Sequence, residues 1–191
     1  MILSESTNFE SSTEGKDLDY YKSLGTFNKD QLKIIGKGIN LGIEVTPYAN
    51  PKFNAEQMEW IRAGIVKNFD VSIYAKEYFD DKQMHQIWYG MCRKLNVSIY
   101  AKPEFDEEQM EVILWGLQEG LDTELYAKSE FRFSQMFEIF MGLKEGLDAS
   151  IYAKSEFDSS QMREIRNRLE EEKLCIEIKR KQNLVPKERN D

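Results

Sequence analysis

The sequence predicts an all-α fold, an α-solenoid of helix pairs in which a short helix alternates with a longer one. The first observation is an internal period of 26 residues, which a tyrosine followed by alanine marks five times along the chain. Phenylalanine and glutamine recur six times each at the same spacing. A segment of this length cannot bury its own apolar face, so the segments must stack on one another. We expect the stack to form a right-handed superhelix.

The recurring residues divide the chain into six predicted repeats with a segment at each end. The repeats span 19–44, 45–70, 71–96, 97–122, 123–148 and 149–174. The residues that mark them are Tyr48, Tyr74, Tyr100, Tyr126 and Tyr152; Phe27, Phe53, Phe79, Phe105, Phe131 and Phe157; and Gln31, Gln57, Gln83, Gln109, Gln135 and Gln161. The first repeat lacks the Tyr-Ala pair and is degenerate. Residues 1–18, rich in Ser, Thr and Glu without periodicity, predict a disordered tail. Residues 175–191 extend the last helix and end in a basic tail.

Each longer helix carries signals for its start and its end. In the fourth repeat, Asp106 and Gln109 have the spacing of a capping box, in which both side chains satisfy free amides at the helix start. Apolar residues follow at helical spacing: Met110, Ile113, Leu114 and Leu117. Gly120 predicts a left-handed residue at the helix end. The same position holds Gly42, Asn68, Lys94 and Gly146 in other repeats. Arg132 breaks the capping pattern in the fifth repeat, where we expect Ser134 to replace it.

A shorter helix of one to two turns is predicted to follow each longer one. Asp122, the last residue of the fourth repeat, caps the short helix that follows it, which ends at the next Tyr-Ala-Lys sequence. In the last repeat Arg168 replaces the mid-helix glycine and Glu172 replaces the glycine that ends the helix. The final helix can therefore continue from Ser159 towards Gln182, before Pro186 ends it.

One glycine recurs in the middle of each longer helix, three residues after a repeated isoleucine. These glycines are Gly38, Gly64, Gly90, Gly116 and Gly142. A glycine in a helix interior lowers stability by about 1 kcal/mol relative to alanine. We therefore expect each one to contact a neighbouring backbone or aromatic ring closely enough to leave no room for a side chain.

Composition and charge exclude several classes of protein. The 34 acidic and 26 basic residues are interspersed and give a net charge of −8, which disfavours direct binding to a nucleic-acid backbone. The first residues lack the basic and apolar regions of a signal peptide, and no apolar stretch is long enough to span a membrane. Two cysteines do not make a disulfide framework in a chain of 191 residues. We expect a cytoplasmic protein.

No residue pattern predicts catalysis, a metal site or a bound cofactor. His85 is the only histidine and has no partners at metal-ligand or catalytic spacing. Cys92 and Cys175 form no motif, and the glycines recur as helix punctuation rather than as a phosphate-binding loop. We expect a protein that is not an enzyme.

The pattern Ile/Leu-Tyr-Ala-Lys-x-x-Phe-x-x-x-Gln-Met-x-x-Ile-x-x-Gly-Leu, read along residues 97–148, resembles a short helical repeat of uncharacterised proteins from gut Firmicutes and their mobile elements. The resemblance covers the second to sixth repeats. It implies a bacterial cytoplasmic setting and a phage or conjugative element, and it brings no catalytic residues. The general plan is also similar to tetratricopeptide-type solenoids, which have a longer period.

Function is expected at the positions that vary between repeats, because solenoids keep their framework residues and vary the exposed ones. The two positions directly after the repeated isoleucine vary in this way. In the second to sixth repeats they hold Arg62-Ala63, Trp88-Tyr89, Leu114-Trp115, Phe140-Met141 and Arg166-Asn167. The central repeats are apolar there, and Phe133 and Phe137 extend this character in the fifth repeat. Trp88, Leu114 and Phe140 lie four residues after a methionine, next to the core stripe, so they can equally be buried.

We expect Tyr89, Trp115 and Met141, together with Trp88, Phe137 and Phe140, to form a patch that binds a protein partner. A homodimer through the same patch is a close variant. The alternative is a phage or mobile-element inhibitor that blocks a host defence or nucleic-acid enzyme through an acidic surface. An interaction through acids would be sensitive to salt, whereas an aromatic one would be lost on aromatic substitution.

Overall fold

The computed structural model describes residues 16–183, in which every element is a helix and no strand occurs. The all-α prediction is confirmed for these residues. The chain divides into two compact parts, Met1–Met84 and His85–Asp191, and the boundary falls inside helix α4 (Asp81–Cys92). Most of the predicted tail, residues 1–15, lies outside the described residues.

The N-terminal part contains helices α1 (Leu18–Ser23), α2 (Lys29–Asn40) and α3 (Ala55–Val66) and the 3-10 helix η1 (Val71–Ile73). Asp17 caps α1 by accepting a hydrogen bond from the Tyr20 amide at 2.9 Å, so helix already begins at the end of the predicted tail. Helix α1 packs on α2, and α2 packs on α3.

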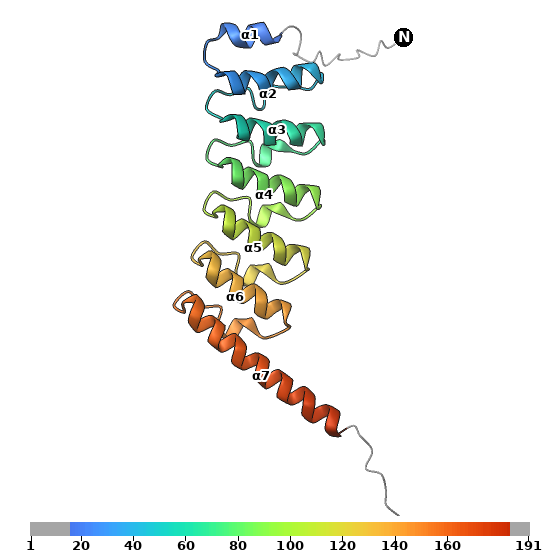
Figure 1. The fold of residues 1–191 in the computed structure, drawn as a ribbon, viewed down its shortest axis with the longest axis vertical. Helices are drawn as coiled ribbons and strands as arrows, with labels where there is room; N and C mark the ends of the chain where they lie inside the picture. The colour runs from blue at the N-terminus through green and yellow to red at the C-terminus, as the bar shows by residue number, and fades with distance from the viewer. Residues whose placement is uncertain (1–15, 184–191) are drawn as a thin grey trace, which may run out of the picture. The chain divides into compact units, whose positions relative to one another are not determined.

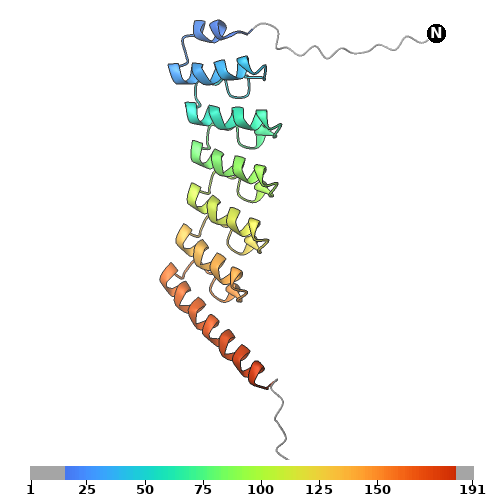
Figure 2. The same cartoon turned by 45° about the vertical axis from the view of Figure 1, so that its right-hand side comes forward.

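The C-terminal part contains the rest of α4, then η2 (Val97–Ile99), α5 (Glu107–Gln118), η3 (Thr123–Leu125), α6 (Phe133–Lys144), η4 (Ala149–Ile151) and α7 (Ser159–Asn183). Helices α5, α6 and α7 lie side by side in chain order (Figures 1 and 2). Helix α7 begins at Ser159 and has 25 residues. It continues past the position where a glycine ends the earlier helices, as the absence of that glycine predicts.

The predicted helix signals are present at both ends of the longer helices. Asp106 accepts a hydrogen bond from the Gln109 amide, and the Gln109 side chain accepts one from the Asp106 amide, both at 2.8 Å. At the other end Gly120 has a φ of +68°, and Leu121 donates to the Gly116 carbonyl at 2.9 Å, which closes a Schellman motif. The equivalent residues with positive φ are Gly42, Asn68, Lys94 and Gly146.

Two predictions about local structure were wrong. Helix α6 begins in the same register as its neighbours, with Arg132 and not Ser134 at the cap position. The Gln135 side chain still accepts from the Arg132 amide at 2.9 Å, but a guanidinium has no acceptor to return. The shorter segment is a single 3-10 turn of three residues in η1, η2, η3 and η4, and only a turn at 46–48, because its tyrosine leaves the helical conformation to reach the preceding helix.

The recurring tyrosine and the mid-helix glycine are partners. The Tyr126 hydroxyl lies against Gly116, where a β-carbon would overlap it, and donates to the Val112 carbonyl at 3.1 Å. Tyr74, Tyr100 and Tyr152 make the same bond to the residue 14 positions earlier. Tyr48 makes the glycine contact, but its buried hydroxyl has no hydrogen-bond partner among the described residues. The prediction of a close aromatic contact at these glycines is confirmed.

Burial of the tyrosine hydroxyls makes their ionisation less favourable. It raises the pKa of Tyr100, Tyr126 and Tyr152 above the ordinary value for tyrosine. The hydroxyl therefore keeps its proton and remains a donor to the helix carbonyl.

The recurring glutamine connects consecutive helical segments as well as capping its own helix. The Gln109 side-chain amide donates to the Phe131 carbonyl at 2.6 Å, 22 residues further along the chain. Gln31, Gln57 and Gln135 make the equivalent bond to Phe53, Phe79 and Phe157. The glutamine amide thus ties the start of one helix to the loop that leads into the next.

We predict that Gly116→Ala destabilises the protein by about 2 kcal/mol, although alanine is the better helix former by about 1 kcal/mol. The added methyl group would overlap the Tyr126 hydroxyl and lie 2.8 Å from Thr123 Cγ2. Urea unfolding followed by circular dichroism measures the change.

Gly36→Ala is the matched control, since its β-carbon would make only an ordinary contact of 3.4 Å with Leu18. It should leave stability unchanged or raise it. Equal midpoints for the two variants would show that the tyrosine contact places no constraint on Gly116.

Candidate functional site

Residues with catalytic or metal-binding chemistry are scattered in the structure. Among the described residues no group of three or more His, Cys, Asp or Glu side chains could hold a metal ion. His85 is half-buried on α4, with its ring 6.3 Å from that of Tyr89. Cys92 is half-buried and Cys175 is exposed, and neither forms a disulfide.

Aromatic rings from α5 and α6 form a cluster in the C-terminal part. The Trp115 ring lies 6.4 Å from Phe137 and 6.0 Å from Phe140, and Phe133 stacks on Phe137 at 6.1 Å. Met141 is half-buried one turn after Phe137 on the same helix. We call Trp115, Phe133, Phe137 and Met141 the aromatic surface.

Phe140 belongs below this surface rather than on it. Its side chain is only 6% exposed, and Leu114, in the equivalent position of α5, is also buried. Phe140 contacts Trp115 and Phe137 from the core side, at 6.0 and 6.3 Å between rings. Phe140 is therefore buried, as one of the two interpretations of the sequence has it, and it supports the accessible rings of Trp115 and Phe137; its part in binding a partner stays a prediction.

The structure does not join Tyr89 to the aromatic surface. Tyr89 is half-buried on α4, where Arg93 donates a hydrogen bond to its hydroxyl at 2.8 Å and lies over its ring at 5.2 Å. In the described part of the chain no ring contact connects Tyr89 with Trp115. Trp88 is half-buried beside it. The predicted patch is thus two neighbourhoods, one at Tyr89 and one around Trp115.

Three carboxylates lie along the same helix as Trp115, before and after it. Glu108, Glu111 and Glu119 are seven residues before, four before and four after it, which places all three on the same helical face. Glu119 pairs with Lys144 of α6 at 2.9 Å, whereas Glu108 and Glu111 have no ion pair among the described residues. The aromatic surface is therefore bordered by negative charge on the α5 side.

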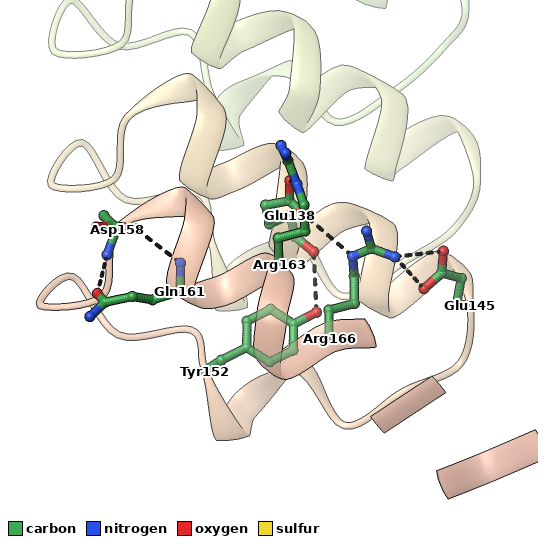
Figure 3. Close-up of polar contacts among 7 residues, drawn as sticks. All are labelled: Glu138, Glu145, Tyr152, Asp158, Gln161, Arg163 and Arg166. Atoms are coloured by element: carbon green, nitrogen blue, oxygen red, sulfur yellow. Dashed lines mark hydrogen bonds and ion pairs between the residues drawn. The ribbon is translucent and has the colours of Figure 1, made fainter. Parts of the chain in front are cut away.

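Charged residues also replace the aromatic ones on α7. Arg166 occupies the position of Phe140, and its guanidinium contacts Glu138 at 3.1 Å and Glu145 at 3.0 Å (Figure 3). Arg163 occupies the position of Phe137 and binds Glu138 at 2.7 Å. The Glu138 side chain is 1% exposed, so two arginines compensate a buried carboxylate between α6 and α7. Figure 3 also shows Tyr152 bonded to the Glu138 backbone carbonyl.

The comparisons with known proteins give no match: no protein-family model, no curated protein and no solved structure is similar to this chain. In the described residues, no helix combines the length and apolar character that crossing a bilayer requires.

Sequence reasoning missed the buried Glu138 and its two arginines. A signal was present, because Glu138 aligns with Val112 of α5 and Arg166 with Leu114, both buried apolar residues. Opposite charges that replace apolar residues at neighbouring positions of consecutive repeats indicate an ion pair inside the interface.

We predict that Arg166→Leu destabilises the protein by about 3 kcal/mol, because it leaves the buried Glu138 carboxylate with only the exposed Arg163. The double variant Glu138→Val, Arg166→Leu replaces both charges with the apolar residues that α5 holds at these positions, Val112 and Leu114. Its free energy of unfolding should lie within about 1 kcal/mol of that of the native protein. Urea unfolding of both variants provides the measurement. A double variant as unstable as the single one would contradict the ion-pair explanation.

Proposed function

We propose that this chain is a non-catalytic α-solenoid adaptor of six 26-residue repeats, 19–174, that binds a protein partner through the aromatic surface. The observation that carries the proposal is the cluster of Trp115, Phe133 and Phe137, half-exposed rings in contact across two packed helices. Aromatic residues and methionine are enriched where proteins bind one another. The right-handed twist, the bacterial cytoplasmic setting and the link to a mobile element belong to the same proposal.

The recurring contacts support the solenoid part of the proposal. The tyrosine–glycine contact and the glutamine–carbonyl bond each join the same positions at intervals of 26 residues. Because each bond reaches only the next segment, stability comes from nearest neighbours, as in repeat proteins. Positions outside these contacts are free to vary and to bind.

The alternative function is an inhibitor from a mobile element that acts through acidic residues on a host defence or nucleic-acid enzyme. Glu108 and Glu111, which have no ion-pair partner in the described chain, favour it. Salt distinguishes the two, since about 0.5 M salt screens exposed charges beyond a few ångströms and leaves apolar contacts intact.

We predict that the triple change Trp115→Ser, Phe137→Ser, Met141→Ser, which removes three residues of the aromatic surface, abolishes binding to the partner captured by the native chain from a bacterial lysate. The three side chains are half-buried, so the melting temperature should fall by several degrees while the protein stays folded at 25 °C. Capture followed by mass spectrometry and circular dichroism melting provide the two readouts.

The matched control is Leu41→Ser, Val66→Ser, Tyr78→Ser, which removes three exposed apolar side chains elsewhere. It should keep the partner. Binding that survives the first variant, or that is lost equally in the control, would argue against the aromatic surface.

A further inference from the structure

The free side of α7 exposes residues that the earlier helices bury. Phe131 and Ile139 are completely covered by the next segment, whereas Phe157 and Ile165 in the equivalent positions are half-buried. Ile151 of η4 is 45% exposed. This side of α7 therefore continues the interface that joins α5 to α6 and α6 to α7, but no segment of the described chain covers it.

Gln161 shows the same incompleteness in its polar contacts. Gln109 and Gln135 are buried, and their side-chain amides donate to the Phe131 and Phe157 carbonyls. Gln161 is exposed, and it uses its side-chain oxygen for the Asp158 cap. The Gln161 amide has no carbonyl to bind among the described residues. The end of the stack thus offers apolar side chains and a free donor together.

Two adjoining hollows follow this side of α7. One, of about 340 Å³, is lined by Ile151, Phe157, Ile165 and Leu169. The other, of about 360 Å³, is lined by the apolar side chains of Leu147, Leu169 and Ile176 and by charged residues that include Lys173, Glu177 and Arg180. Arg168 and Glu172 border the first hollow, and neither belongs to an ion pair in the described chain. The two hollows form one groove along the helix.

The heptad spacing of α7 shows what can fill this groove. Ile165, Leu169, Glu172 and Ile176 are separated by four, three and four residues, which places them in one stripe. In an antiparallel pair of identical helices centred near residue 170, Ile165 lies opposite Ile176 of the second copy. Leu169 then lies opposite Glu172 of the second copy, and Arg168, the neighbour of Leu169, is close enough to pair with that carboxylate; the two-fold axis makes this ion pair twice.

At the N-terminal end of the described residues, 16–24, a short helix already covers the face of α2. Helix α1 packs on α2 there, and Tyr21 is buried against the α2 side with its ring 6.0 Å from Phe27. A head-to-tail contact would also generate an open polymer, whereas two copies of the α7 face close on each other.

We propose that the groove along α7 binds α7 of a second copy of this chain in antiparallel orientation, forming a two-fold dimer. Each copy inserts Ile176 into the hollow lined by Ile151, Phe157 and Ile165 of the other. The dimer does not use the aromatic surface, which stays accessible to a different partner.

Sedimentation and light scattering of the full chain test the proposal between about 1 and 500 µM, the range of moderate affinities. The mass should rise with concentration from 22.5 kDa to twice that value and then stop. A mass that stays at 22.5 kDa, or one that keeps growing past the dimer, would overturn the two-fold α7 pair.

Ile176→Lys should abolish the dimer at every concentration, because a charge replaces the side chain that enters the hollow. Leu174→Lys is the matched control: Leu174 is 57% exposed and Ile176 50%, but Leu174 lies on nearly the opposite side of α7. It should leave the mass curve unchanged. A dimer that is lost in the control and kept in Ile176→Lys contradicts the groove as the contact.

A charge exchange tests the orientation. Arg168→Glu should weaken the dimer at least tenfold, because it puts two carboxylates opposite each other twice. Arg168→Glu, Glu172→Arg should restore it, since the exchanged charges again face their opposites in a second copy. Failure of the double variant to restore the dimer overturns the antiparallel register. Loss of the dimer only in Trp115→Ser, Phe137→Ser, Met141→Ser would place self-association on the aromatic surface instead.

Discussion

The contact between a tyrosine hydroxyl and a glycine of the preceding helix is the constraint on which the rest of the described structure depends. The hydroxyl can donate to a helix carbonyl only where the backbone is not shielded by a side chain, and glycine provides that opening. The tyrosine always lies ten residues after its glycine, which requires the helix to end within one turn and the chain to reverse. The left-handed residue and the single 3-10 turn accomplish this reversal. The period of the sequence therefore reflects the geometry of one contact.

A second requirement fixes how one segment meets the next. The glutamine side chain uses its oxygen for its own helix start and its amide for the Phe carbonyl of the following loop, so one residue satisfies two backbone groups that would otherwise be buried without partners. Because the tyrosine and the glutamine make these contacts, the position shared by Val112 and Glu138 can hold either an apolar or a charged side chain. Val112 fills it with apolar contact, and Glu138 fills it with a carboxylate held by two arginines.

The sequence predicts the helices, their caps and the tyrosine-type contact because each depends on residues close together or repeated at one spacing. Gln109 shows where this reasoning stops: its capping role is local, but its amide reaches a carbonyl 22 residues away, and nothing in the local pattern requires that. The candidate site is less predictable for a similar reason. Phe137 and Phe140 lie at the border of the core stripe, where a rotation of the helix decides which ring is buried. Equal spacing of Tyr89 and Trp115 likewise does not bring their side chains together, because Arg93 holds Tyr89.

The proposed binding role is supported by the two positions after the repeated isoleucine, because the fold does not require aromatic residues there. On α3 the position of Trp115 holds Ala63, and its neighbour Arg62 pairs with Glu59. On α7 the same pair of positions holds Asn167 and Arg166, and Arg166 is held by Glu138 and Glu145. Helices of the same framework thus accept small or charged residues there, since tyrosine, glutamine and isoleucine already supply the packing. Half-exposed aromatic rings at α5 and α6 add little that the framework lacks, and exposing them to water is unfavourable by about 25 cal/mol for each square ångström. A protein partner that covers these rings would remove that unfavourable term, which is the physical basis for proposing a binding surface at Trp115 and Phe137.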